Sequence, residues 1–212
     1  MHMQTKDYIE AIDGAERRVF ATLTDVEVRA KEGKPTEIFG YGAVFNSDSM
    51  VMRTSRGEKF IERIERGAFD HLLDDNGIMI LFNHDANFPL ARNKRSATIG
   101  ADETGLWYSF APPESPMGQN IQESIRRGDV KTSSFSFKVS EQNENWKIRK
   151  GEPSIRTIKK FDKVFDLGPV TFEAYPDTMV ITRNYSVFDD YKKDLAEMDI
   201  VAMKLQLNNK TK

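Results

Sequence analysis

The sequence contains no cysteine. Disulfide bonds, cysteine nucleophiles and thiolate metal sites are therefore excluded together, and a reducing compartment fits this composition. Long apolar runs are also missing, because none approaches the ~20 residues that a membrane-spanning helix needs. The opening stretch MHMQTKDYIEAIDG lacks the basic and then apolar order of a secretory signal. These absences predict a cytoplasmic protein without a membrane partner.

An excess of one sign of charge is absent too. The 31 lysines and arginines are offset by 33 aspartates and glutamates, and the basic residues are spread among the acidic ones. A nucleic-acid partner is therefore not expected. The 212 residues, 39% of them hydrophobic, can bury one sizeable core.

The pattern along the chain predicts one main domain with short appendages. We expect a flexible segment over residues 1–16, a single domain over 17–185, a helix over 186–207 and a disordered tail over 208–212. The helix is predicted because apolar residues in its stretch recur on one helical face. It either closes the core of its own domain or offers that apolar face to a partner helix.

Short strand-like runs separated by turn residues dominate the domain. Gly40 and Gly42 in the run IFGYGAVFN indicate a bulge or a tight bend. The predicted strands are 19–30, 38–46, 78–82, 97–101, 106–111, 130–140, 155–167 and 169–175, and the predicted short helices are 66–77 and 118–129. This pattern favours an α+β fold, mainly an antiparallel β-barrel with a few short helices.

One histidine stands where a catalytic base would be expected. In LFNHD, His84 directly follows the apolar run IMILF, so a buried strand would hold it rigidly while a loop leaves it open to substrate. A lone histidine is more often a structural residue than a base. His71 in a predicted helix and His2 near the start are weaker candidates.

A serine-rich strand offers nucleophiles for such a base. Without cysteine, the nucleophile has to be serine or threonine. In TSSFSF, Ser134 and Ser136 share one face of the strand and Phe135 and Phe137 share the other. The phenylalanines can pack in the core while the hydroxyls face a cleft, but on spacing alone the plainer interpretation is that the serines decorate a solvent-exposed face.

A carboxylate completes this set of candidates. Asp166 opens the segment FDLGPVTFEAYP, and Glu173 lies further along it. An aspartate that orients the imidazole also stabilises the imidazolium that forms during catalysis. Aspartates before strands are also common turn residues, and spacing alone does not bring Asp166 to His84.

Five segments in order carry a family resemblance. They are GYGAVFN, ERIERGAFDHLL, LFNHD followed by PLAR, RRGDVKTSSFSF, and FDLGPVTFEAYPDT. This series, from about residue 20 to about residue 183, resembles the prohead (capsid maturation) proteases of tailed bacteriophages. The resemblance implies a serine peptidase with a fold similar to the β-barrel of herpesvirus assemblin.

The resemblance also implies roles for individual residues. Ser134 matches the family nucleophile, His84 the family base and Asp166 the acidic member, which is more often glutamate in the family. Arg92 matches an arginine that supports the oxyanion or places a water there, although a surface salt bridge is the plainer interpretation. Ser136 stands where the family usually has glycine, which leaves both serines open as nucleophile.

The implied function is that of a prohead serine endopeptidase. Such an enzyme cleaves scaffold protein, or the scaffolding part of the major capsid protein, and commonly itself, within the immature capsid in the host cytoplasm. Its expected partners are the capsid and scaffold proteins, with a homo-oligomer left open, and no cofactor or metal is expected. The alternatives are a non-catalytic scaffold or capsid-assembly protein on the same fold, and a hydrolase of small esters.

Overall fold

The computed structural model describes residues 15–20, 25–30, 36–54, 56–172, 179–180 and 193. Most of the expected flexible segment 1–16, the expected helix over 186–207 apart from Lys193, and the expected tail 208–212 therefore lie outside the described residues. The proposed domain division stays a prediction.

Strands are the main secondary structure of the described chain. They are β1 (Glu16–Phe20), β2 (Glu27–Arg29), β3 (Glu37–Val44), β4 (Met52–Thr54), β5 (Lys59–Ile64), β6 (Met79–Leu81), β7 (Pro89–Arg92), β8 (Ala97–Ala101), β9 (Gly105–Phe110), β10 (Thr132–Lys138), β11 (Glu144–Lys147), β12 (Ser154–Ile158), β13 (Lys163–Val170) and β14 (Met179–Val180). One α-helix, α2 (Pro116–Arg126), and two 3-10 turns, η1 (Asp70–Leu72) and η2 (Glu141–Asn143), accompany them among these residues.

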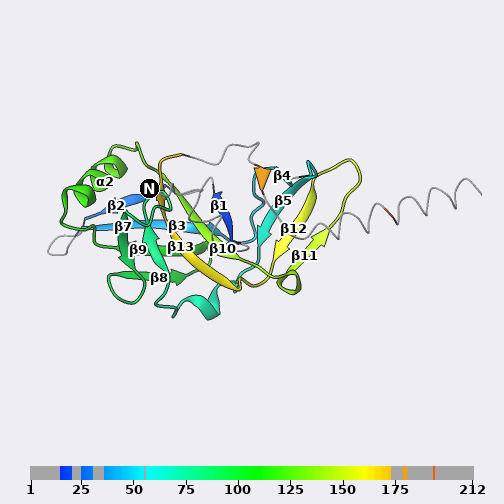
Figure 1. Cartoon of the computed structure of the whole chain (residues 1–212), viewed down its shortest axis with the longest axis horizontal. Helices are drawn as coiled ribbons and strands as arrows, with labels where there is room; N and C mark the ends of the chain where they lie inside the picture. The colour runs from blue at the N-terminus through cyan, green and yellow to red at the C-terminus, as the bar shows by residue number, and fades with distance from the viewer. Residues whose placement is uncertain are drawn as a thin grey trace, which may run out of the picture.

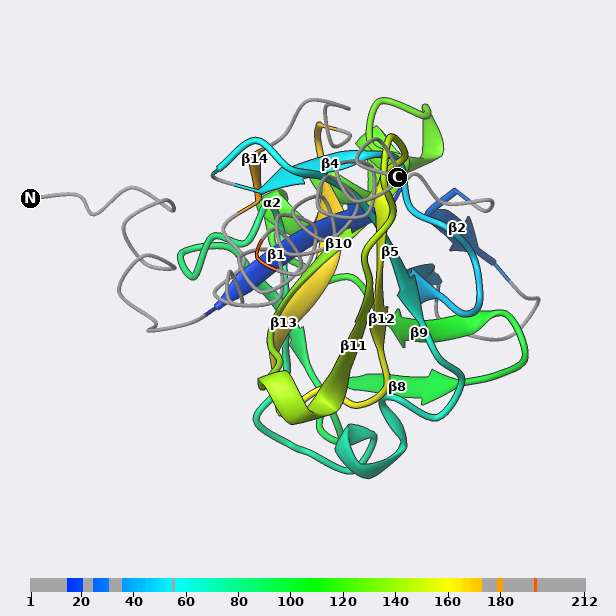
Figure 2. The ribbon, with the colours of Figure 1, turned by 90° about the vertical axis from the view of Figure 1, so that its right-hand side faces the viewer.

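The strands form three open sheets (Figure 1). The first has the order β1-β10-β13-β6-β7, the second β11-β12-β5-β4-β14, and the third β2-β3-β9-β8. In Figure 2 the long strands of the second sheet run steeply across β8 and β9 of the third. The mainly β architecture is confirmed, but the predicted closed barrel is wrong.

The connections differ from those of the expected antiparallel barrel. Three pairings are parallel, namely β12 with β5, β13 with β6, and β14 with β4. Each joins strands far apart in sequence, so the chain moves from one sheet to another instead of continuing as an antiparallel meander. Alternation of apolar residues identifies a strand but not its partner, and the sequence pattern therefore could not exclude this arrangement.

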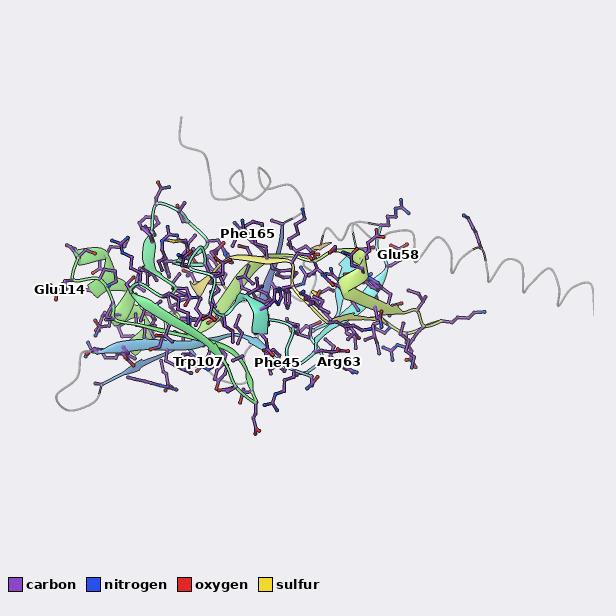
Figure 3. The ribbon with its side chains drawn as sticks, turned by 90° about the horizontal axis from the view of Figure 1, so that it is seen from below. Phe45, Glu58, Arg63, Trp107, Glu114 and Phe165 are labelled. Atoms are coloured by element: carbon purple, nitrogen blue, oxygen red, sulfur yellow. The ribbon has the colours of Figure 1, made fainter. Side chains whose placement is uncertain are left out.

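The core lies between the first and third sheets. Phe135 and Phe137 of β10 are fully buried there, as their alternation predicts. Phe69 stacks on Phe161 with ring centroids 4.2 Å apart and closes one end of this aromatic cluster. Figure 3 shows Phe165 of β13 and Trp107 of β9 on opposite sides of the molecule, which marks the outer faces of the two layers.

Some of the predicted elements are confirmed and others differ from the structure. The bulge is confirmed, because the register between β3 and β9 shifts around Gly42. The helix predicted over 118–129 is α2, whose N-terminus is capped by the Ser115 side chain. The helix predicted over 66–77 contains only the short turn η1. No helix in the described ranges is long and apolar enough to cross a membrane.

Candidate active site

Strand register brings the candidate site residues together. In the antiparallel pair of β10 and β13, Ser134 lies opposite Gly168 and Ser136 opposite Asp166. Strand β6 runs parallel to β13 on its other side, and the turn that follows β6 carries His84. The order β10-β13-β6 therefore places the serine, the aspartate and the histidine on neighbouring strands or strand ends.

Ser134, His84 and Asp166 form one hydrogen-bonded chain. His84 Nε2 lies 2.5 Å from Ser134 Oγ, and His84 Nδ1 lies 2.5 Å from Asp166 Oδ1. The exposed fractions are 0% for Ser134, 6% for His84 and 3% for Asp166. A carboxylate can only accept, so Asp166 fixes the proton on Nδ1 and leaves Nε2 free to accept the serine proton.

The backbone around His84 adopts an unusual conformation. Asn83 has φ 54° and His84 has φ 58°. Positive φ is uncommon outside glycine, although asparagine tolerates it better than most residues. Two consecutive left-handed residues turn the chain sharply after β6 and direct the imidazole toward Ser134.

Asn83 ties this turn to the end of β13. Its backbone N–H donates to Pro169 O at 3.1 Å, and its Nδ2 donates to Thr171 Oγ1 at 3.0 Å. Its Oδ1 accepts from the Thr171 N–H at 2.8 Å. Sequence reasoning missed this role, although an asparagine at a sharp turn beside a candidate base is the signal that could have found it.

The Ser136 hydroxyl hydrogen-bonds to Asp166 and not to the imidazole of His84. Its Oγ donates to Asp166 Oδ2, so the two carboxylate oxygens are occupied by Ser136 and His84 respectively. Arg17 of β1 lies opposite Ser136 in the antiparallel pairing of β1 with β10. Burial lowers the pKa of the Arg17 guanidinium, and attraction to the Asp166 charge opposes that shift. Of the two serines, only Ser134 bonds the imidazole.

The Ser134 hydroxyl has a second acceptor. Its Oγ also lies 2.9 Å from the carbonyl oxygen of Arg18 on β1. A hydroxyl has a single proton, so it serves either the imidazole or this carbonyl at one time. A main-chain carbonyl therefore lies directly beside the candidate nucleophile.

The remaining candidates lie elsewhere. Arg92 is exposed on β7, where its Nη1 donates to Asn76 O at 3.4 Å. Its expected support of the oxyanion stays a prediction. His71 is exposed, and His2 lies outside the described residues. Within the described ranges, no group of three or more histidine, aspartate or glutamate side chains could hold a metal ion.

A buried cluster of charges lies on the other face of β1. Glu16 and Arg18 of β1 contact Glu62 of β5 and Arg156 of β12, and Glu144 of β11 also bonds Arg156. Burial alone would raise the pKa of Glu16, but the guanidiniums of Arg156 and Arg18 lower that pKa by more than burial raises it, so the net shift is downward. Sequence reasoning missed this cluster entirely.

The model of the caudovirus prohead serine protease family matches residues 24–193, which is most of the chain. The protein therefore belongs to this family of serine proteases, which act in the phage procapsid. Searches among curated proteins and among solved structures returned no match. The likeness to herpesvirus assemblin stays a prediction.

Proposed function

We propose that this protein is the endopeptidase that cleaves scaffold protein, or the scaffolding part of the major capsid protein, inside the prohead, and that it also cleaves itself. The hydrogen-bonded chain of Ser134, His84 and Asp166 carries the proposal. Membership of the prohead serine protease family supports the same reaction class. In this proposal Ser134 is the nucleophile, His84 the base and Asp166 the orienting acid.

The geometry supports an acyl-transfer mechanism. His84 Nε2 takes the Ser134 proton as Oγ attacks the scissile carbonyl carbon, and the imidazolium then gives that proton to the leaving amine. Water, deprotonated by His84, releases the acyl group and restores Ser134. Because Asp166 is buried against the ring, its negative charge stabilises the imidazolium more strongly than it would in water.

The hydrogen bonds favour Ser134 over Ser136 as nucleophile. Ser136 lies two residues after Ser134 on β10 and donates its hydroxyl proton to Asp166, so that proton has no direct path to the imidazole. Its role in this proposal is to hold the carboxylate in the orientation that faces His84 Nδ1.

The test follows the intact masses of the enzyme and its capsid protein over time. Wild type should produce defined fragments, Ser134→Ala should lower their rate of formation by roughly 10⁴-fold or more, and Ser136→Ala should still produce them. Fragments that persist unchanged in Ser134→Ala would overturn the assignment. If wild type yields none even inside assembled proheads, the non-catalytic scaffold alternative replaces the proposal.

A further inference from the structure

Strand β1 runs beside the strand that carries the nucleophile. In Figures 1 and 2 β1 and β10 lie side by side, and their antiparallel register pairs Val19 with Ser134 and Arg17 with Ser136. The Arg18 carbonyl oxygen lies 2.9 Å from Ser134 Oγ. Extended peptides commonly bind proteins by adding a strand to a sheet, which leaves their carbonyls in the plane of that sheet. Residues Glu16–Phe20 thus lie where a protease would hold the segment that it cuts.

The Arg18 side chain enters a buried acidic site. Side chains alternate along a strand, so Arg18 projects to the face opposite Ser134. Its Nε donates to Glu62 Oε1 at 2.8 Å and its Nη2 donates to Glu62 Oε2 at 2.9 Å. Arg18 is 4% exposed and Glu62 is fully buried. This two-point pairing is specific for a planar guanidinium, which makes the site selective for arginine.

Glu16, two residues before Arg18, pairs with a buried positive charge, the guanidinium of Arg156. Arg156 donates to both of its carboxylate oxygens, with Nη1 at 2.6 Å and Nη2 at 2.8 Å. Arg156 lies beside Glu62 because β12 and β5 pair in parallel with these two residues in register. Strand β1 therefore presents a buried glutamate and, two residues later, a buried arginine, which lie on the same face of an extended peptide.

Without β1, Glu62 and Arg156 would each lose one ion-pair partner. Arg156 would keep Glu62 and Glu144, but Glu62 would lose the guanidinium of Arg18 that bonds both of its oxygens. Removing one partner from a buried cluster of charges is strongly unfavourable. The surface beneath β1 is therefore complementary to an extended segment with glutamate and, two residues later, arginine.

We propose that β1 occupies the place of the substrate strand, and that Glu62 and Arg156 make the enzyme specific for arginine before the cleaved bond and glutamate two residues before that arginine. This inference rests on the proposed protease function and specifies its substrate class. The chain's own segment Glu16–Phe20 meets this specificity. While it occupies the site, other segments are excluded from it.

Self-cleavage then has a defined bond. Ser134 Oγ bonds to the Arg18 carbonyl carbon, the C–N bond to Val19 breaks, and the Ser134 proton passes through His84 to the Val19 nitrogen. Water releases Arg18 as a free carboxylate. The expected product begins at Val19, and mass spectrometry of incubated full-length protein should detect it in wild type but not in Ser134→Ala.

Specificity is measured with quenched fluorogenic peptides, after the full-length protein has been incubated until self-cleavage after Arg18 is complete. The parent peptide has the sequence of residues 15–20, Ala-Glu-Arg-Arg-Val-Phe. We expect cleavage at the bond equivalent to Arg18–Val19. Peptides with Arg18→Leu or Glu16→Gln should lose about tenfold or more in kcat/KM, because each removes one ion-pair partner from a buried charge of the enzyme.

Enzyme variants assign the specificity to individual side chains. Glu62→Gln should reduce the ratio of kcat/KM between the parent and Arg18→Leu peptides, and Arg156→Gln should reduce the ratio between the parent and Glu16→Gln peptides. A ratio is used because partial unfolding lowers both of its terms equally. Glu65→Gln makes the same chemical change just after β5, outside the cluster, and should leave both ratios unchanged.

The outcomes separate this inference from the proposed function. Ser134-dependent cleavage with no preference for arginine, or with a preference that survives Glu62→Gln, overturns the inference and leaves the protease assignment intact. No Ser134-dependent cleavage of any peptide or of capsid protein in proheads overturns both.

Discussion

Gly168 of β13 lies against the carbonyl oxygen of Leu81, the last residue of β6. A Cβ built on Gly168 would be 2.2 Å from that oxygen, far inside van der Waals contact. The obstacle is backbone, so it cannot be relieved by turning a side chain. Because His84 follows β6 by three residues and Asp166 precedes Gly168 by two, this close approach controls the distance between base and acid.

We therefore expect Gly168→Ala to impair both stability and cleavage. The added methyl group has to separate β6 from β13, at a cost of about 1–3 kcal/mol, which moves His84 away from its partners. Thermal unfolding and the rate of capsid-protein cleavage measure the two effects. Gly151→Ala is the control, since Gly151 has positive φ but no atom near its Cβ position. It should lose stability without losing catalytic rate, and equal rate losses in both variants would contradict the explanation.

Asn83→Ala should lower the cleavage rate more than it lowers stability. The substitution removes two side-chain hydrogen bonds to Thr171 and replaces asparagine by a residue that tolerates positive φ poorly. His84 would then occupy its productive orientation for a smaller fraction of time, and we expect kcat to fall by about tenfold with little change in KM. Asn87→Ala, in the same loop but bonded only to Asp85, should leave kcat near wild type. Equal kcat values for the two variants would refute a positioning role for Asn83.

Ser136→Ala should weaken catalysis without abolishing it. The variant removes one hydrogen bond to a buried carboxylate, a loss of about 1.5–3 kcal/mol, and corresponds to a rate loss of roughly 10- to 100-fold if the full amount is lost in the transition state. Single-turnover rates of peptide cleavage provide the measurement. Ser109→Ala, which removes a hydroxyl on β9 that donates to the exposed Glu37, is the matched control. Complete inactivation by Ser136→Ala would instead favour Ser136 as the nucleophile.

Much of the site could be predicted because its chemistry depends on residue types with few alternatives. The chain has three histidines, and only His84 follows a buried strand. Alternation correctly placed Phe135 in the core and Ser134 on the opposite face. The contact between His84 and Asp166 could not be predicted, because it depends on the parallel pairing of β6 with β13, across 82 residues of sequence.

The buried charges escaped prediction for a different physical reason. Glu62 and Arg156 occupy inward-facing positions of strands β5 and β12, where burial of a charge is normally unfavourable. A charge at such a position is acceptable only when its partner is present, and here the partners come from other strands. The alternation of Phe60, Glu62 and Ile64 was the available signal, since it places a carboxylate on the apolar side of a strand.

Acidification should selectively remove the stabilisation that Glu16 provides. Its pKa in the folded protein lies below the ordinary glutamate value of 4.5, because attraction to Arg156 and Arg18 outweighs the effect of burial. A lowered folded pKa stabilises the fold above the unfolded pKa, and this contribution disappears as the pH falls through the folded value. The free energy of unfolding of wild type should therefore exceed that of Glu16→Gln most clearly near pH ~7, and the gap should shrink below pH ~4. Urea denaturation at several pH values measures this gap.

Glu27→Gln, which changes an exposed carboxylate on β2, should cost no more than about 1 kcal/mol at either pH. A gap between wild type and Glu16→Gln that stays constant into acid would show that the charge of Glu16 does not anchor β1.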